Sequence, residues 1–222
     1  MDQPGLEEAR HRQALDALNR VNWLSDSAGM VWPGIRRLAR ELAPRPVRVL
    51  DVASGGGDVA LALSRKAARA GVPLQIEGCD FSPYACQHAT ERARRARADV
   101  RFFSFDALAG PLPAGYDVIM CSLFLHHLDE PQAVALLRAM SEAAAHLVLV
   151  NDLRRSRLGY VLAHIVARLV TRSEVVHVDG PLSVAGAFTI PEVEHIARQA
   201  ELQGAVVARK WPERFLLSWS RR

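Results

Sequence analysis

The chain has 222 residues, enough for one α/β domain with a well-buried core and too few for two ordinary domains. Half of its residues are hydrophobic and 23% are charged, which indicates a globular chain and excludes a disordered one. The net charge of +4 is mild, and the arginine-rich run at 91–97 predicts a solvated helix face, so we expect no nucleic-acid partner. Cys79, Cys86 and Cys121 form no CxxC pair, which indicates a reducing compartment with neither a disulfide framework nor a zinc site.

The first residues are polar and contain no apolar stretch of the kind found in a signal peptide. The most apolar window, 158–170, is too short to span a bilayer and carries His164 and Arg168. We therefore expect a cytoplasmic protein without an integral membrane span.

Residues 6–42 show apolar residues at helical spacing, and we expect helices there with a break around 29–34. Trp23 and Trp32 lie near that break. Large aromatic side chains in such a place pack in a core or belong to a lid over a ligand cleft, and the sequence leaves both interpretations open.

The stretch 47–63, VRVLDVASGGGDVALAL, predicts an apolar strand that ends in an acid, then a glycine turn, then a helix. Gly55, Gly56 and Gly57 permit a sharp turn in which a ligand can lie against bare backbone. Asp58 suits the N-cap or first turn of the following helix. A strand, a glycine turn and a helix N-terminus in this order are typical of a site for a nucleotide-like ligand.

Strand and helix patterns then alternate along the chain. Such repeats predict a parallel sheet with helices on both faces, and right-handed crossovers place the carboxyl end of every parallel strand at one edge. We expect helices at 58–70, 83–98 and 130–145, and strands at 74–80, 100–106, 116–122 and 146–152. The polar residues gathered at that edge are Asp51, Asp80, Asp106, Ser122 and Asp152.

The alternation is interrupted at 154–189, which contains the apolar helix and then a segment rich in glycine and proline. A long insertion after a strand lies over the ligand edge, and we expect it to form a substrate cap. A helix at 191–200 follows, and strands at 204–210 and 214–220 are joined too tightly for a parallel crossover, which predicts an antiparallel hairpin. We expect one domain over 1–222, made of an N-terminal helical lid (1–44), a cofactor-binding core (45–152), a cap (153–190) and a closing helix and hairpin (191–222).

Two ligands fit the glycine turn. Gly55-x-Gly57-x-x-Ala60 satisfies the loose dinucleotide pattern, and Asp80 follows Gly57 at about the distance of a ribose-binding acid. The additional acids Asp51 and Asp106 and the closing hairpin count against a dinucleotide. An oxidoreductase that uses a nicotinamide cofactor stays the alternative, as does a non-catalytic binding protein on the same fold.

Four motifs in order carry a resemblance to a known family: DVASGGG at 51–57, GCDFS at 78–82, FDA at 105–107, and YDVI with LHHL at 116–128. The series resembles the class I S-adenosylmethionine-dependent methyltransferases, in particular the small-molecule branch related to ubiquinone and menaquinone biosynthesis. The resemblance implies a Rossmann-like seven-stranded, mostly parallel sheet with an antiparallel last strand. It also implies S-adenosylmethionine as the cofactor.

The resemblance implies roles for the strand-end residues. Gly55 and Gly57 would bring backbone against the methionine and ribose portion of the cofactor, and Asp51 would favour its cationic amino end. Asp80 would accept hydrogen bonds from both ribose hydroxyls, because a carboxylate offers two acceptor oxygens. The other cofactor-binding residues that it implies are Ala53, Ser54, Phe81, Asp106, Ala107 and Ser122.

Within that set, Phe81 would pack on the adenine ring, and Asp106, with Ala107 beside it, would accept from the adenine amine. Ser122 would lie near the sulfonium. Ala53 departs from the family pattern, which has glycine there, and we expect its φ to be negative because alanine tolerates that conformation.

Methyl transfer from a sulfonium is a direct displacement that needs no covalent intermediate, and we expect no metal site. A general base assists if the acceptor is a hydroxyl, and His126 or His127, after the fourth strand, is the candidate. The apolar cap favours a small hydrophobic acceptor, phenolic or polyketide-like, and O-methylation over C-methylation. Packing of the cap on the sheet accounts equally well for its apolar residues.

Overall fold

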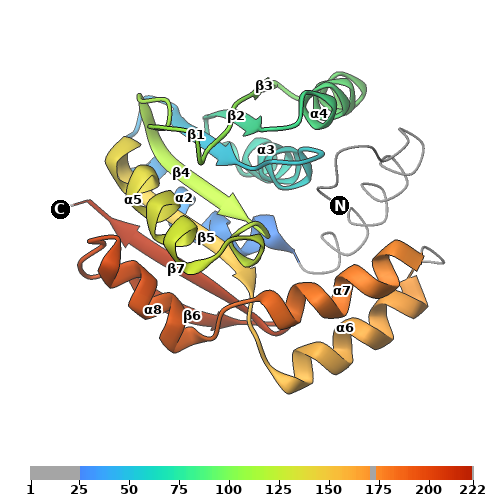
Figure 1. Ribbon diagram of the computed structural model, residues 1–222. Helices are drawn as coiled ribbons and strands as arrows, with labels where there is room; N and C mark the ends of the chain where they lie inside the picture. Colours follow the sequence, from blue (N-terminus) through green and yellow to red (C-terminus); the bar gives the residue numbers. More distant parts are fainter. Residues whose placement is uncertain (1–25, 171–173, 222) are drawn as a thin grey trace.

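The computed structural model describes residues 26–170 and 174–221 (Figure 1). Its centre is a seven-stranded sheet in the order β3-β2-β1-β4-β5-β7-β6. Neighbouring strands from β3 to β5 run parallel, and β7 is antiparallel to both β5 and β6, as the sequence predicted. The strands are β1 Val47–Val52, β2 Leu74–Asp80, β3 Val100–Ser104, β4 Tyr116–Ser122, β5 Ala144–Leu153, β6 Val206–Lys210 and β7 Arg214–Ser220.

Helices cover both faces of the sheet, which explains why β1 and β4 are buried at nearly every position. One core lies under α2 (Ser27–Glu41), α3 (Asp58–Ala70) and α4 (Pro83–Ala96). The other lies under α5 (Glu130–Ala143) and α8 (Ile190–Gln199). Alternate residues of β5 enter the two cores, with Val148 and Val150 in the second and Leu147 and Leu149 in the first.

Local signals in the sequence set where these helices begin. Ser82 accepts a hydrogen bond from the Ala85 backbone N–H at 3.3 Å, and Pro83 occupies the first turn of α4, where its missing N–H costs nothing. At α5, Asp129 and Gln132 form a reciprocal capping box with distances of 2.8 and 3.1 Å. The cap at Ser82 starts α4 directly after β2, whereas the short helix η1, Leu125–His127, lies between β4 and the capped start of α5.

The predicted break at 29–34 is wrong, because α2 runs without interruption through Gly29, Pro33 and Gly34. Asp26 caps the helix by accepting from the Gly29 N–H at 2.9 Å. A Cβ on Gly34 would lie 3.5 Å from Leu147, an ordinary van der Waals distance, so α2 packs on β5 at this position. Packing of the apolar face of α2 outweighs the helix-breaking tendency of proline and glycine. The predicted helix before residue 26, with Trp23, lies outside the described residues, whereas Trp32 packs on the core.

Two helices, α6 (Arg157–Val170) and α7 (Glu174–Gly186), form the insertion between β5 and α8. They pack against each other and extend from the carboxyl end of β5 (Figure 1). The segment rich in glycine and proline is helical, with Pro181 inside α7. α7 also contacts the short helix η1, Leu125–His127, so the insertion lies against the residues that follow β4. Among the described helices, none has the length and apolar character that a membrane span requires.

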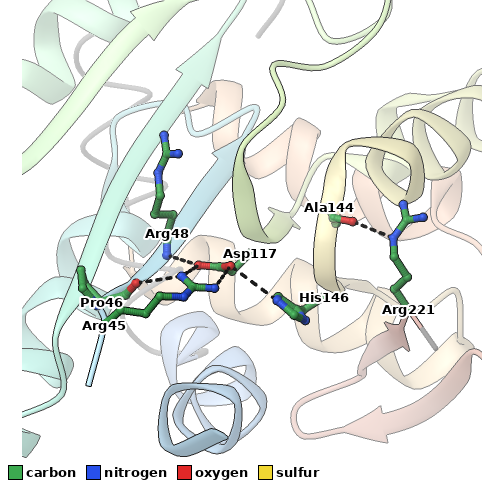
Figure 2. A network of polar contacts seen from close by, with 7 residues as sticks. All are labelled: Arg45, Pro46, Arg48, Asp117, Ala144, His146 and Arg221. Carbon is green, nitrogen blue, oxygen red and sulfur yellow. Dashed lines mark hydrogen bonds and ion pairs between the residues drawn. The ribbon is translucent and has the colours of Figure 1, made fainter. Parts of the chain in front are cut away.

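The opposite edge of the sheet is held by a buried carboxylate, Asp117 at the start of β4 (Figure 2). The Arg45 guanidinium donates to both of its oxygens at 2.7 and 2.8 Å, and the Arg48 backbone N–H donates at 2.8 Å. His146 Nε2 lies 3.7 Å away. The hydrogen bonds from Arg45 lower the pKa of Asp117 below its ordinary value. This network joins the amino ends of β1, β4 and β5, far from the ligand edge.

We predict that Asp117→Ala lowers the free energy of unfolding at pH 7 by about 2–3 kcal/mol, because it leaves the Arg48 N–H without its acceptor. Since the folded-state pKa of Asp117 is lowered, the stabilisation is present above the unfolded-state pKa and is lost as the pH falls through the folded-state value. Urea unfolding at pH 7 and pH 3 measures this. The control Glu41→Ala removes only an exposed pair with Arg37 and should change stability by less than about 0.5 kcal/mol. Equal losses at both pH values would contradict the prediction.

Candidate functional site

The carboxyl ends of β1, β2, β4 and β5 lie side by side, as expected for parallel strands. Val52 pairs with Cys79 on one side and with Cys121 on the other, and Ser122 pairs with Asn151. Four polar residues at or near these ends therefore meet at one edge: Asp51, Asp80, Ser122 and Asp152. Asp106 is the exception, because β3 ends at Ser104, two residues before the predicted end.

The glycine turn is held by backbone hydrogen bonds to β2 and within itself. Ser54 N–H donates to Cys79 O at 2.9 Å, and Gly57 N–H donates to Ser54 O at 2.9 Å. Gly57 has φ 75°, and a Cβ there would lie 2.6 Å from the Phe102 ring, so close packing requires glycine. Gly55 has φ 51°, and in the described structure a Cβ there would meet nothing within 4 Å. The turn is thus packed on one side and open at Gly55, where a ligand can approach the backbone.

Ala53 has φ 54°, in the left-handed region, so the expectation of a negative φ is wrong. The chain must leave β1 and turn back to bond with Cys79 within two residues, and this path sets the conformation. A left-handed alanine costs about 1–2 kcal/mol. The family preference for glycine at this position therefore has a conformational reason, and this chain carries the strain instead.

Arg92, on α4, clamps the glycine turn from outside. Its Nη1 donates to Gly56 O at 2.6 Å and also binds the carboxylate of Asp58, the first residue of α3. Sequence analysis assigned the run 91–97 to a solvated face and missed this residue. Its position one helical turn after His88, on the side of α4 that faces the turn, is visible only in the fold.

The Asp80 carboxylate is fixed by two backbone donors. Gly55 N–H donates to Oδ2 at 2.8 Å, and Ser82 N–H donates to Oδ1 at 2.9 Å. A carboxylate offers two acceptor oxygens. A carboxylate with this fixed orientation suits a vicinal diol.

Phe81 follows directly and is 64% exposed. It does not fill the core, and its ring is available to a flat partner. Asp106 is exposed and accepts a hydrogen bond from the Leu108 N–H at 2.9 Å. This contact lies within its own loop and stabilises the turn there. Ala107 packs partly against the core beside it.

Asp51 is almost wholly buried, with 1% of its surface exposed. Burial raises its pKa from 3.8 to about 8, and the carboxylates of Asp58 and Asp80 add to the rise. Among the described residues, Oδ2 of Asp51 and Oγ of Ser54 have no hydrogen-bond partner. Buried polar atoms without partners are rare, and here they mark a place where a ligand can supply the missing donors.

His126 and Asp152 form a buried pair at the ends of η1 and β5. His126 Nδ1 lies 2.6 Å from Asp152 Oδ1, and the His126 backbone N–H donates to Oδ2 at 3.2 Å. Their side chains are 6% and 1% exposed. His127 is exposed, with its ring centroid 4.1 Å from that of His126. Sequence analysis named both histidines and placed Asp152 at the same edge, but it did not predict that one histidine would be paired with that acid.

Ser122, at the end of β4, accepts a long hydrogen bond of 3.4 Å from Asn151. It is half-buried, and its strand neighbours β1, which leads into the glycine turn. Across the described residues, no cluster of three or more His, Cys, Asp or Glu side chains is arranged to hold a metal ion.

We predict that Asp51→Asn stabilises the folded chain at neutral and alkaline pH. Because the folded-state pKa of Asp51 is raised, proton binding favours the folded state below pH 4, and this contribution is lost as the pH rises toward 8. The variant cannot ionise, so its free energy of unfolding should exceed that of the wild type by on the order of 3 kcal/mol at pH 8, with little difference at pH 4. Chemical denaturation at both pH values measures this, with exposed Asp99→Asn as the control. A variant less stable than the wild type at pH 8 would contradict the assignment.

Comparison with known proteins finds similarity to methyltransferases over part of the chain. The methyltransferase domain family matches residues 49–146, which include β1, the glycine turn and β4. A demethylmenaquinone methyltransferase of Deinococcus radiodurans is 36% identical over 140 residues, which cover 61% of this chain and 54% of the relative. A ubiquinone biosynthesis O-methyltransferase of Albidiferax ferrireducens is 32% identical over 127 residues, covering 55% of this chain and 48% of the relative. The chain therefore spans about half the length of these curated relatives.

The fold agrees. The S-adenosylmethionine-dependent methyltransferase SibL, solved in its apo form, superposes with a TM-score of 0.66 at 23% identity, over 99% of this chain and 60% of that one. The sequence match covers the segment that forms the glycine turn and carries the acids at the ends of β1 and β2. The sheet order agrees with that match. Over residues 49–146 the chain is thus similar to the methyltransferase domain family, and its fold is similar to that of an S-adenosylmethionine-dependent methyltransferase.

Proposed function

We propose that the protein transfers a methyl group from S-adenosylmethionine to a hydroxyl of a small hydrophobic acceptor. The observation that carries the cofactor half is the buried Asp51 carboxylate, whose Oδ2 has no partner among the described residues, beside the open backbone at Gly55. A cationic ammonium is the group that compensates such a carboxylate. The Asp51 carboxylate and the open backbone at Gly55 therefore fit the amino end of S-adenosylmethionine.

The other predicted residues fit the rest of that cofactor. Asp80, held by two backbone donors, would accept from the ribose hydroxyls, and the exposed ring of Phe81 would pack on the adenine. Gly55 and Ser54 would lie against the methionine portion. Asp106 and Ala107 would flank the adenine, and Ser122 would lie toward the reacting end. When bound, S-adenosylmethionine supplies a methyl group on a positively charged sulfur.

On the acceptor side we assign His126 as the general base and Asp152 as the residue that positions it. The Nδ1–H of His126 donates to Asp152 in the neutral tautomer, which leaves Nε2 as the acceptor nitrogen of the ring. A hydroxyl acceptor gives up its proton as it attacks, and neutral imidazole takes that proton near neutral pH. His127, which is exposed and not held by Asp152, is the weaker candidate.

The cap supports a hydrophobic acceptor. α7 contacts η1, so the insertion lies beside His126. Its apolar side chains Leu158, Val161, Ile165 and Leu182 are each about half exposed and available to an apolar ligand. The relatives named for demethylmenaquinone and ubiquinone biosynthesis make an aromatic, hydroxylated acceptor the first choice. In this proposal 153–190 is the substrate cap, 1–44 the lid, and the protein acts in the cytoplasm.

Equilibrium binding of S-adenosylhomocysteine tests the cofactor half. We expect saturable binding by the wild type and none of reduced nicotinamide dinucleotide. Phe81→Ala should weaken binding about 5–10-fold, because it removes one aromatic stacking partner, without changing stability, since the ring is exposed. The matched control Val206→Ala truncates another exposed apolar side chain, on β6, and should bind as the wild type does. The proposal would be rejected by tight binding of the reduced nicotinamide dinucleotide, or by the absence of S-adenosylhomocysteine binding.

Turnover with a panel of phenols and hydroquinones tests the acceptor half. We predict that His126→Gln and Asp152→Asn each lower kcat about 100-fold, the lower end of what general-base catalysis supplies, while the affinity for S-adenosylhomocysteine stays within twofold. His127→Gln should lower kcat less than fivefold. Mass spectrometry of the product locates the new methyl group. Methylation at carbon, or equal losses from both histidine substitutions, would refute the assignment of His126.

A further inference from the structure

The turn that we assign to the cofactor contains three consecutive glycines, Gly55, Gly56 and Gly57. Glycine has the widest choice of backbone conformations and loses the most conformational entropy when its backbone is fixed. A flexible segment that is ordered only on binding lowers the affinity for its ligand. A turn of this composition therefore binds a ligand more tightly when other parts of the protein hold it in one conformation beforehand.

Arg92 supplies such a contact from α4. Its Nη1 donates to Gly56 O at 2.6 Å, and the same nitrogen binds the carboxylate of Asp58, the first residue of α3. The Gly57 N–H belongs to the same peptide unit as the Gly56 carbonyl, and it donates to Ser54 O at 2.9 Å. The peptide between Gly56 and Gly57 is thus held at both of its polar groups, and Arg92 holds one of them.

The contact depends on the close approach of α4 to the turn. A Cβ on Gly56 would lie 3.2 Å from Arg92 Nη1 and 3.6 Å from the His88 ring. Positions 88 and 92 are one helical turn apart, so they share the face of α4 that lies over the turn. The side chains of Arg92 and Asp58 are 28% and 19% exposed. Water and salt therefore weaken this contact less than they weaken a fully exposed ion pair.

The amino end of α4 adjoins the other half of the proposed cofactor site. The helix begins at Pro83, two residues after Phe81, and its cap residue Ser82 donates a backbone hydrogen bond to Asp80 Oδ1 at 2.9 Å. From inside the site, the Gly55 N–H donates to Asp80 Oδ2 at 2.8 Å. α4 therefore links the residues proposed for the ribose and adenine to the turn proposed for the methionine portion.

We propose that Arg92 is a positioning residue for the cofactor, which holds the Gly56 carbonyl and the Asp58 carboxylate and so fixes the glycine turn in its binding conformation before the cofactor arrives. The inference rests on the proposed binding of S-adenosylmethionine at this turn. A planar guanidinium with several donors can hold a carbonyl and a carboxylate together, which the compact ammonium of lysine does less well.

Hydrogen exchange of the Gly57 amide, followed by NMR in the full chain without cofactor, tests whether Arg92 holds the turn. In Arg92→Ala we expect this amide to exchange on the order of tenfold faster, because the turn opens more often. The Val49 amide, inside β1, should keep its rate. Arg95→Ala is the matched control, because Arg95 lies on the same helix and pairs with the exposed Glu91 at 3.0 Å. Unchanged exchange of Gly57 in Arg92→Ala would overturn the proposal.

Calorimetric titration with S-adenosylhomocysteine tests the consequence for the cofactor. Arg92→Ala should bind about tenfold more weakly, because ordering of the turn then falls on the binding step. In turnover, KM for S-adenosylmethionine should rise by a similar factor while kcat at saturating cofactor stays within twofold, since the bound turn has the same conformation. A lower kcat with unchanged affinity would contradict the proposal. Arg92→Met, which keeps the length of the side chain without its donors, covers the case in which Arg92→Ala does not fold.

Two further variants separate the clamp from the charge of Arg92. Arg92→Lys should recover only part of the affinity, and Asp58→Asn, which leaves the contact with Gly56, should bind within threefold of the wild type. If Asp58→Asn loses as much affinity as Arg92→Ala while Arg92→Lys binds as the wild type does, the charge acts and the proposal is overturned. Faster exchange of Gly57 with unchanged affinity would refute this inference alone, whereas no binding of S-adenosylhomocysteine by the wild type would refute the proposed function.

Discussion

The parallel alignment of β1, β2, β4 and β5 is the constraint on which the rest of the structure depends. It gathers the carboxyl ends of four strands at one edge and so brings together Asp51, Asp80 and Asp152, which are far apart in the sequence. The central strands β1 and β4 are buried along most of their length because helices cover both faces. Polar chemistry is thereby confined to the strand ends, where backbone N–H groups and short loops hold it in place.

The two ends of the parallel strands differ in how well their buried carboxylates are paired. At the amino ends, Asp117 is fully engaged by Arg45 and the Arg48 backbone, and its pKa is lowered, so this carboxylate stabilises the fold. At the carboxyl ends, Asp51 is buried, its Oδ2 has no hydrogen-bond partner in the part of the chain that the structure describes, and its pKa is raised to about 8. A protein retains such an unfavourable group where a ligand compensates it. The contrast between Asp117 and Asp51 is physical support for a cofactor site at one edge only.

Much of this could be predicted from the sequence, because its signals are local. Strand periodicity, the glycine run and the short joint between the last two strands predicted the sheet and its antiparallel ending. The long-range contacts could not be predicted. The uninterrupted α2 depends on its packing against β5. The clamp by Arg92 depends on how α4 approaches the glycine turn, and the pairing of His126 with Asp152 depends on the register of separate strands. The positive φ of Ala53 depends on the path back to β2, which residue type alone does not reveal.

The central claim is that Asp51 binds the charged amino end of the cofactor, and calorimetry tests it most directly. S-adenosylhomocysteine should be titrated into the full chain at pH 7 in two buffers of different ionisation enthalpy. Since the pKa of Asp51 is raised to about 8, the carboxyl is mostly protonated before binding and must ionise to pair with an ammonium. We expect one-to-one binding with release of close to one proton, and we expect that proton release to be absent in Asp51→Asn. Binding without proton release would contradict it.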